Sequence, residues 1–576
     1  MIFYRAGIGL LVPNSMKILL NHLGFEMAGY KSALVEAPAD FSAHAFTVYD
    51  AANREPVFKG MLAAEGGVAN WGGGRLHYWR ADFSGLLQAG EYFLAIDGLE
   101  PPLVSNTFSI AAQLFGTLLL SDIVHYLKGQ RCTGLYDYAD RSRPKWGSDE
   151  RRDVHGGWYD ASGDCSKYLS HLSYANFMNP QQTPQVVWNL LDGLAQMPPQ
   201  LKWFDERIVD EALHGADFLV RMQDPQGYFY MTVFDQWSKD ENRRDICSYK
   251  IKGEKFDTFQ AGYRQGGGMA IAALARASLA RRDGEFDRAR YLSSAVAGFA
   301  HLELHNQAYL DDGVENIIDD YCALLAATEL LAVTGDGAYA DAAARRVGCL
   351  LDKQSDAGWF HADVLGQRSY FHAAEAGMPL LALMRYLEVA PASPMAARIR
   401  EAVHRAYCFE LEITFDEVNN PFGYPRQLIK QPSQQARTQF FIPHDNGTGY
   451  WWQGENARLG SIASAAARAR RLFQEDENFV AQLARYEQSA LDWILGNNPF
   501  DSCMLQGWGR NNPRYEPGYF NAPGGVCNGI TSGFDDEQDI DFKLSEIATM
   551  DHSWRWREQW IPHGAWLFLA ICSRMA

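Results

Sequence analysis

Two acidic residues stand four positions apart in the segment DVHGGWYDASGD, which covers residues 153–164. The glycines of this segment favour a tight loop, so Asp160 and Asp164 are expected to lie close enough to perturb each other's protonation. Two carboxyl groups held in this way can orient a water molecule and take a proton from it. Calcium-binding loops and acidic turns use the same residue types, and the spacing alone leaves these alternatives open.

A third acidic residue, Glu558, lies in the segment WRWREQWIPHGAW among four tryptophans. Apolar surroundings raise the pKa of a carboxyl group, so Glu558 is expected to keep its proton to higher pH, as a general acid requires. The alternative is an ordinary ion pair with Arg555 or Arg557.

Three consecutive aromatic residues, Tyr450, Trp451 and Trp452, occur in the segment HDNGTGYWWQGENARLG at residues 444–460. They cannot all face one core, so at least one of them is expected to be exposed as a flat platform for a sugar ring. The alternative is that they brace the loop. The 16 Trp and 27 Tyr of the whole chain fit a carbohydrate-binding cleft and a Trp-rich core equally well.

The overall composition excludes some partners. A net charge of −18 argues against nucleic acid and anionic membranes, which need clustered Lys and Arg. Nine cysteines without CxxC spacing indicate free thiols in a reducing compartment. No apolar run reaches the length of a membrane span. Residues 1–15 are interrupted by Arg5, Pro13 and Asn14 and do not resemble an export signal, so a cytoplasmic protein without a cofactor is expected.

The elements that must position these residues change in type along the chain. Residues 16–110 contain seven short segments of period two, such as GEYFLAI, in which Tyr92, Leu94 and Ile96 share one face; this pattern predicts a β-sandwich. From residue 111 the apolar spacing becomes helical, and about twelve helices are expected, which suit a toroid of paired helices. The long segments 140–184, 415–455 and 497–560 between the helices are expected to be functional loops.

Several motifs, in order along the chain, are similar to landmarks of family 9 glycoside hydrolases, which act with inversion: ILLNHLGF, DVHGGWYDASGD, YWWQGENARL and LDWILGNNPFD. The resemblance implies an immunoglobulin-like domain at residues 16–110 and an (α/α)₆-barrel catalytic domain at residues 111–576. It also implies that Asp164 is the catalytic base, that Asp160 helps to hold the water and that Glu558 is the acid. Substrate contacts are expected from these motifs and their surroundings, at Trp158, Tyr159, His444, Asp445, Tyr450, Trp451, Trp452, Glu455, Arg514 and Trp556.

Three departures separate this sequence from the cellulases of the family. Three residues rather than two stand between the aspartates, and the place of the cellulase His-His-Arg cluster offers only Arg514 and Tyr515. Some relatives have a zinc site. Of its ligands only Cys132 has a counterpart in this sequence, and no Cys-His pair follows it, so no metal is expected. The sequence thereby resembles the intracellular exo-β-glucosaminidases of chitin and chitosan breakdown.

The ammonium group of a glucosamine unit would need a carboxylate partner. The candidates are Asp445, Glu455 and an acidic run that contains Asp535, Asp536, Asp539 and Asp541. The alternatives are a cellodextrinase, an endoglucanase or a β-glucosidase that acts on β-1,4-glucans, or a non-catalytic sugar-binding protein on the same fold.

Overall fold

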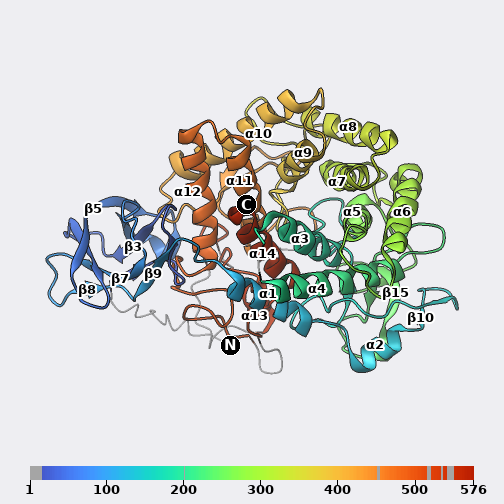
Figure 1. The fold of residues 1–576 in the computed structure, drawn as a ribbon, viewed down its shortest axis with the longest axis horizontal. Helices are drawn as coiled ribbons and strands as arrows, with labels where there is room; N and C mark the ends of the chain where they lie inside the picture. Colours follow the sequence, from blue (N-terminus) through green and yellow to red (C-terminus); the bar gives the residue numbers. More distant parts are fainter. Residues whose placement is uncertain (1–15, 200, 450–454, 516–520, 534–535, 541–549) are drawn as a thin grey trace, which may run out of the picture.

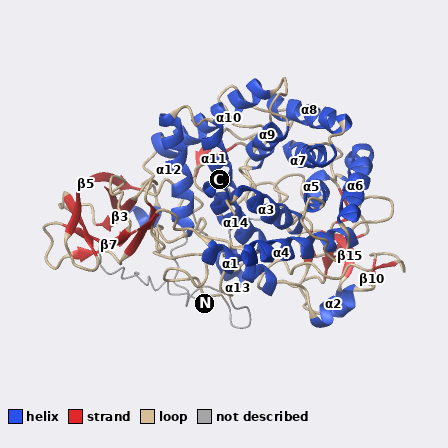
Figure 2. Ribbon diagram, in the orientation of Figure 1, coloured by secondary structure: helices blue, strands red, loops and turns tan. Residues whose placement is uncertain are grey.

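The computed structural model describes residues 16–199, 201–449, 455–515, 521–533, 536–540 and 550–576. Strands dominate the N-terminal part of the chain, and a ring of helices follows it (Figures 1 and 2). The last strand of the N-terminal part ends at Ala111, and the first helix begins at Thr117.

The N-terminal part is a β-sandwich in which one long strand, β5, belongs to both layers. Residues 56–61 of β5 pair with β4 and residues 62–67 pair with β6, so the chain passes from one layer to the other along this strand. In β7, Tyr92, Leu94 and Ile96 are buried, which confirms the predicted alternation. The strands are β1 (Lys17–Leu19), β2 (Phe25–Glu26), β3 (Ser32–Ala37), β4 (Ala45–Asp50), β5 (Pro56–Gly67), β6 (His77–Asp82), β7 (Gly90–Ile96), β8 (Leu103–Val104) and β9 (Phe108–Ala111).

In the described part of the chain, six helices pack side by side into a closed inner ring, and each also contacts an outer helix. The inner helix α5 is buried along its whole length, as expected of a helix that is apolar on all sides. The inner helices are α3 (Thr183–Gln196), α5 (Gly267–Ala277), α7 (Ile317–Thr334), α9 (Met378–Val389), α11 (Asn456–Leu472) and α14 (Ile561–Met575). The outer helices are α1 (Thr117–Gly129), α4 (Lys202–Arg221), α6 (Arg288–Tyr309), α8 (Gly337–Asp352), α10 (Ala396–Leu411) and α12 (Glu477–Ile494).

The predicted long loops all lead into the N-terminal ends of inner helices, namely α3, α11 and α14. The short helix α2 (Gly134–Asp140) comes directly before the first of these loops, and the last of them contains the short helix α13 (Met550–Arg557). Together with the segment before α5, the loops also contain the short strands β10 (Arg143–Pro144), β11 (Arg151–Arg152), β12 (Lys167–Tyr168), β13 (Phe229–Tyr230), β14 (Thr232–Phe234), β15 (Asp245–Tyr249), β16 (Lys255–Phe256), β17 (Gln260–Ala261), β18 (Gln427–Ile429) and β19 (Arg437–Gln439). One end of the ring therefore carries most of the irregular backbone, which is where side chains can be placed for chemistry.

The sandwich is joined to the ring by specific contacts. Lys17 Nζ donates to the carbonyl of Pro499 at 2.7 Å, and the Asn21 amide donates to Asp492 Oδ1 at 2.8 Å. Trp71, which is buried, packs its ring against Phe440 and Phe441 of the loop before α11. The sandwich thus contacts the same loops that lead to the inner helices.

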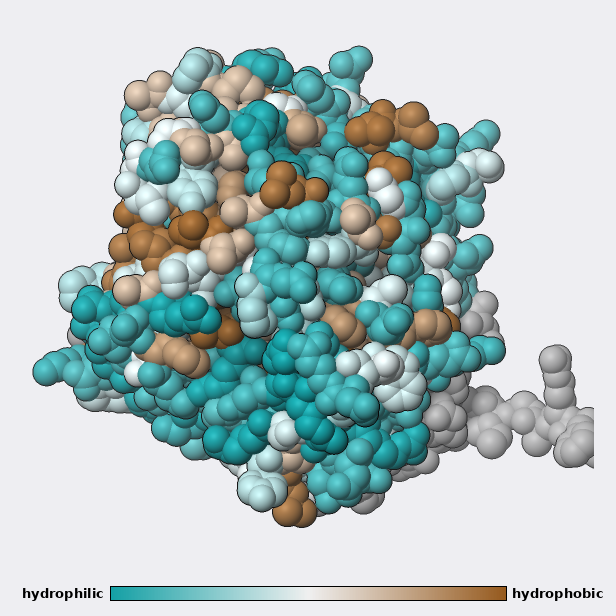
Figure 3. Space-filling model, turned by 90° about the vertical axis from the view of Figure 1, so that its right-hand side faces the viewer, coloured by the Kyte–Doolittle hydropathy of each residue, from teal (hydrophilic) through white to brown (hydrophobic). Residues whose placement is uncertain are grey.

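The surface agrees with the strongly acidic composition. The face of the ring seen in Figure 3 is mostly hydrophilic, and its hydrophobic residues lie in separate groups. Among the described helices, none is both long and apolar enough to cross a membrane. All nine cysteines lie in the described ranges as free thiols, as predicted.

Candidate active site

Asp160 lies in the loop before α3 and is fixed by its backbone. Its amide N–H donates to the carbonyl of Ser166, and its own carbonyl accepts from the N–H of Ile561 at the start of α14. The side chain is 1% exposed, and neither carboxyl oxygen has a hydrogen-bond partner within the described residues. Burial, with the nearby charges of Asp164 and Glu558, raises the pKa of Asp160 well above its ordinary value. Neither oxygen of this buried carboxyl group is therefore engaged by the described residues.

Asp164 closes the same loop but has fixed partners. Its Oδ1 accepts from the N–H of Ser166 at 2.8 Å, and its Oδ2 accepts from the Tyr168 hydroxyl at 2.9 Å. Burial raises the pKa of Asp164, although these hydrogen bonds favour the ionised form and oppose the shift. The residue as a whole is partly exposed, unlike Asp160.

Glu558 reaches the aspartate loop from the turn between α13 and α14. Its Oε1 accepts from the N–H of Gly163 at 3.0 Å, and its Oε2 accepts from the Trp560 indole N–H at 2.8 Å. Burial raises the pKa of Glu558 to about 7, and the charge of Asp164 adds to the effect. The ion pair with Arg555 or Arg557, considered from the sequence, is not among the contacts described for this side chain. A carboxyl group with this pKa can hold a proton near neutral pH and release it in a reaction.

Gly163 explains how the carboxyl of Glu558 fits against the aspartate loop. A Cβ atom at this position would lie 2.5 Å from Glu558 Oε1 and 3.3 Å from the Tyr515 hydroxyl. Only a residue without a side chain leaves room for this approach. The third residue between the two aspartates, noted from the sequence, is therefore the glycine that contacts the predicted acid.

His171 also belongs to this group, although no motif in the sequence indicates it. Its Nδ1 lies 3.7 Å from Asp160 Oδ2, and its ring packs edge-on against Tyr168 and Trp560, both at 4.8 Å between centroids. Burial lowers the pKa of His171 to about 3, which keeps the ring neutral beside Asp160. A single histidine in the segment KYLSHL gives no signal of its own, because histidines of this kind are common in cores.

Two of the predicted substrate contacts, Trp158 and Glu455, are buried in the protein. Trp158 is completely buried, and its indole N–H donates to Glu211 at 2.6 Å, so it braces α4 from inside. Glu455 is 1% exposed and accepts from the Tyr424 hydroxyl at 2.7 Å and from the Arg458 guanidinium. Both residues use their polar atoms within the protein and have no surface to offer a sugar.

Other predicted contacts occupy varied positions. The Tyr159 hydroxyl bonds to the backbone of Thr133, and Trp556 stacks on Phe500 at 5.7 Å, so both rings contribute to packing. Arg514 is exposed. Tyr450, Trp451 and Trp452 lie outside the described residues.

His444 and Asp445 begin the segment that leads to α11. The backbone N–H of His444 donates to Glu537 Oε2 at 2.9 Å, and its ring lies 3.3 Å from the Ser532 hydroxyl. The Asp445 side chain is exposed. His444 is therefore partly exposed and Asp445 is exposed, whereas Glu455 is buried.

The acidic run is not a free surface loop where the structure describes it. Asp536 accepts from the Asn70 amide at 2.9 Å, and Asp539 accepts from the N–H of Gly72 at 3.2 Å. These carboxylates hold the run against the N-terminal sandwich, so Asp536 and Asp539 are already engaged there. Asp535 and Asp541 lie outside the described residues. Within the described ranges, no group of three or more His, Cys, Asp or Glu side chains is arranged to hold a metal ion.

Comparison with known proteins agrees with this arrangement. Residues 117–516 match the model of glycosyl hydrolase family 9, and residues 14–101 match the cellulase N-terminal ig-like domain. A cellodextrinase of Butyrivibrio fibrisolvens is 30% identical over 240 residues, which are 38% of this chain and 40% of that protein.

Two solved structures show the same fold over nearly the whole chain. One is a metagenome-derived family 9 endoglucanase with a TM-score of 0.68 and 18% identity, and the other is a family 9 protein of Bacteroides ovatus with a TM-score of 0.64 and 18% identity. Each similarity covers 97% of this chain and 98% of the other. The immunoglobulin-like sandwich and the (α/α)₆ barrel are thus confirmed, and the chain belongs to glycosyl hydrolase family 9, as a glycoside hydrolase.

Proposed function

We propose that this chain hydrolyses β-1,4-linked sugar oligomers with inversion, with Asp164 as base, Asp160 as its partner in holding the water and Glu558 as acid. The observation that carries the proposal is the convergence of these three carboxyl groups from segments about 400 positions apart. The backbone N–H of Gly163, next to the predicted base, holds the predicted acid.

The protonation of the three groups supports these roles. An inverting enzyme needs an ionised base on one side of the bond and a protonated acid on the other, roughly 6.5–9.5 Å apart. The two hydrogen bonds to Asp164 favour its ionised form, whereas the buried Glu558 keeps its proton up to a pKa of about 7. A water molecule that donates to Asp160 would supply the hydrogen bond that this carboxyl does not receive from the described residues.

For the sugar itself we propose a glucosamine unit at the non-reducing end of a chitosan or chitin oligosaccharide. The support is the extra residue in the aspartate loop, the absence of the His-His-Arg cluster and the exposed carboxylate of Asp445. Asp445 is the candidate for the substrate ammonium, because Glu455, Asp536 and Asp539 already have partners in the protein. A charge-assisted hydrogen bond of this type contributes about 1.5–3 kcal/mol.

A cellodextrinase is the second candidate. It is favoured by the partial similarity to the Butyrivibrio fibrisolvens cellodextrinase. The two candidates differ only in what they recognise at the 2-position of the sugar, so one set of substrates distinguishes them.

The experiment compares kcat/KM for the β-1,4-linked dimers of glucosamine, N-acetylglucosamine and glucose. We expect the glucosamine dimer to be preferred by about ten- to a hundredfold, and Asp445→Asn to reduce that preference. Proton NMR of the first product should show the α-anomer, because water attacks opposite the leaving group. Preference for cellobiose would replace the amino-sugar proposal with the cellodextrinase, and early β-anomer would overturn the inverting mechanism itself.

A further inference from the structure

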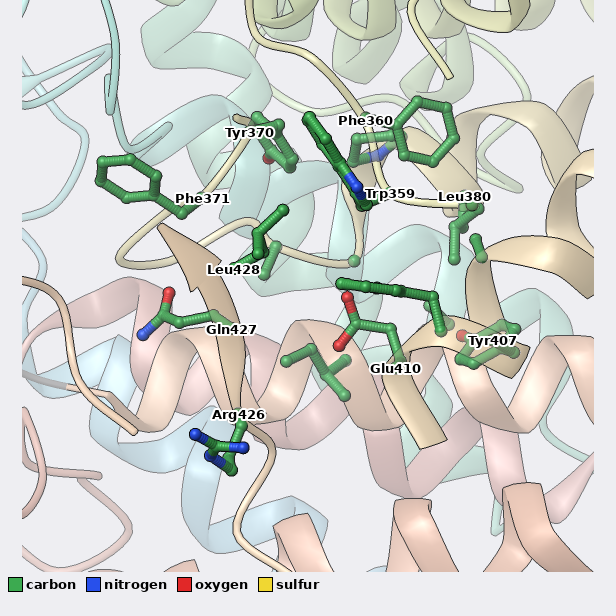
Figure 4. A pocket seen from close by; sticks show the side chains of 18 of the residues that line it. Trp359, Phe360, Tyr370, Phe371, Leu380, Tyr407, Glu410, Arg426, Gln427 and Leu428 are labelled. Carbon is green, nitrogen blue, oxygen red and sulfur yellow. The ribbon is translucent and has the colours of Figure 1, made fainter. Parts of the chain in front are cut away.

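A second pocket lies away from the three carboxyl groups, among helices α9, α10, α11 and α12. It encloses about 60 Å³, which is room for several water molecules or one compact organic group. Aromatic side chains, including Trp359, Phe360, Tyr370 and Phe371, line one side of it, and Glu410 faces them from the other side (Figure 4). Asp160, Asp164 and Glu558 are not among its lining residues.

Glu410 is the acidic group of this pocket. Its carboxylate accepts a hydrogen bond from the Tyr486 hydroxyl at 3.0 Å. Burial raises the pKa of Glu410 to about 7, although this hydrogen bond and the charge of Arg458 act in the opposite direction. The carboxyl is therefore poorly compensated by its surroundings, and a cation placed beside it would favour its ionised form.

Two further polar groups belong to residues of the lining. The Tyr407 hydroxyl and Gln427 Oε1 have no hydrogen-bond partner in the part of the chain that the structure describes. Tyr407 is 2% exposed and Gln427 is 7% exposed. Buried polar atoms of this kind normally have a partner, so both point to a bound group that can donate hydrogen bonds.

The two arginines of the lining are neutralised by other groups. Arg458 forms an ion pair with Glu455 and donates to the carbonyl of Pro425 at 2.9 Å. Arg426 forms an ion pair with Glu417 at 3.0 Å. Glu410 is thus left as the acidic group of the lining without an arginine partner.

We propose that this pocket binds a compact organic ammonium ion. The faces of aromatic rings attract cations, and aromatic cages are a known means of recognising ammonium groups. The Glu410 carboxylate supplies the opposite charge, and the Tyr407 hydroxyl and Gln427 oxygen accept hydrogen bonds from an N–H or hydroxyl of the ligand. A neutral sugar would use the aromatic faces but would leave the charge of Glu410 without a counterion.

The pocket and the candidate active site border the same apolar cluster. Phe371 lines the pocket and also belongs to the apolar cluster that contains Ala161 of the aspartate loop and Trp560. Binding in the pocket therefore does not require contact with the catalytic groups. This separation allows the two sites to be tested independently.

The test measures binding to the full chain by isothermal titration calorimetry. The ligands are choline, ethanolamine and 3,3-dimethyl-1-butanol, which is the neutral isostere of choline. We expect choline and ethanolamine to bind, and the isostere to bind at least tenfold more weakly. Glu410→Gln should weaken choline binding by about tenfold, whereas Glu412→Gln, which removes an exposed charge nearby, should leave it unchanged. If choline binds more tightly than ethanolamine, the pocket recognises the methyl groups. If ethanolamine binds more tightly, the pocket recognises the N–H donors.

Asp164→Asn is the control for the catalytic cleft, and its binding of choline should equal that of the wild type. Trp359→Leu is a second pocket variant, expected to weaken choline binding severalfold, and it keeps the test valid if Glu410→Gln does not fold. Equal affinity for choline and its neutral isostere, or binding that survives both pocket variants, would overturn the proposal. So would the absence of choline binding at millimolar concentrations.

Discussion

The two ends of the helical ring contain buried carboxyl groups with opposite behaviour. At the N-terminal ends of α3 and α14, burial raises the pKa values of Asp160, Asp164 and Glu558. Toward the C-terminal ends of the inner helices lie Asp192 of α3 and Glu329 of α7, which are 1% and 0% exposed. Burial acts to raise their pKa values too, but arginines lower them overall.

The difference lies in the partners rather than in the burial. Asp192 is bound by Arg276 at 2.7 Å and by Arg468, and Glu329 is bound by Arg276 at 2.6 Å and by Arg385 at 2.9 Å. These guanidinium groups come from three other helices, α5, α9 and α11. They keep the two carboxylates ionised and join the inner helices to one another. The ring thus has a compensated end, with Asp192 and Glu329, and a reactive end, where the three carboxyl groups of the candidate active site have no arginine partner among the described residues.

The largest expected effect is the loss of activity in Glu558→Gln at the reactive end. The amide cannot donate a proton to the leaving oxygen, so kcat should fall by about 10²- to 10⁴-fold. In the wild type, kcat/KM should decrease as the pH rises through about 7, because the acid then loses its proton. In the variant, kcat/KM should not show this decrease at alkaline pH.

The measurement is a pH–rate profile of both proteins with the preferred dimer. Glu412→Gln serves as the matched control, since its side chain is exposed and should change neither rate nor profile. Activity of Glu558→Gln within tenfold of the wild type would remove this residue from the mechanism.

The same substitution at the compensated end should affect stability instead. Glu329→Gln leaves Arg276 and Arg385 without this carboxylate, and breaking a buried ion pair costs about 3–5 kcal/mol. The lowered pKa of Glu329 means that its contribution is present at pH 7 and is lost at acidic pH as the group gains a proton. Urea unfolding at pH 7 measures the loss, with the exposed Glu401→Gln as control.

The activity of the folded Glu329→Gln protein should equal that of the wild type. If the free energy of unfolding of Glu329→Gln lies within about 1 kcal/mol of the wild-type value, these arginines do not need Glu329 as their partner. The comparison between the two ends would then no longer hold.

The smallest expected effect is a gain in stability for Asp160→Asn. Because the pKa of Asp160 is raised in the folded state, its ionised form destabilises the protein once the pH exceeds the ordinary value of about 4. The amide removes this charge but remains polar and buried, so at pH 7 we expect a gain of about 1 kcal/mol together with loss of activity.

Thermal unfolding of both proteins between pH 4 and pH 8 tests this effect. The difference in Tm should be largest at neutral pH and should shrink toward pH 4, where Asp160 begins to gain a proton in the unfolded state as well. A variant that is less stable at all pH values would indicate that Asp160 is structural, like Asp192.

The sequence determined the secondary structure and the family by local patterns. Alternation in segments such as GEYFLAI predicts a half-buried strand, and burial of Tyr92, Leu94 and Ile96 in β7 confirms it. In α4, the buried residues Val209, Ala212, Leu213 and Ala216 recur at the helical spacing expected of the chain after residue 111. These predictions succeed because the faces that strands and helices bury are set by fixed periods of the backbone.

Only the tertiary structure decided which residues of the loops face the core. Trp158 and Glu455 lie in the same motifs as the candidate catalytic and binding residues, yet both face the core, where Glu211 and Arg458 bind them. His171 and Gly163 join the site without any motif of their own. Loops have no fixed period, so the direction of each side chain depends on partners that are distant in the sequence. The same reason explains why Asp160 and Asp192, both buried aspartates, differ: the arginines that compensate Asp192 come from other helices of the ring.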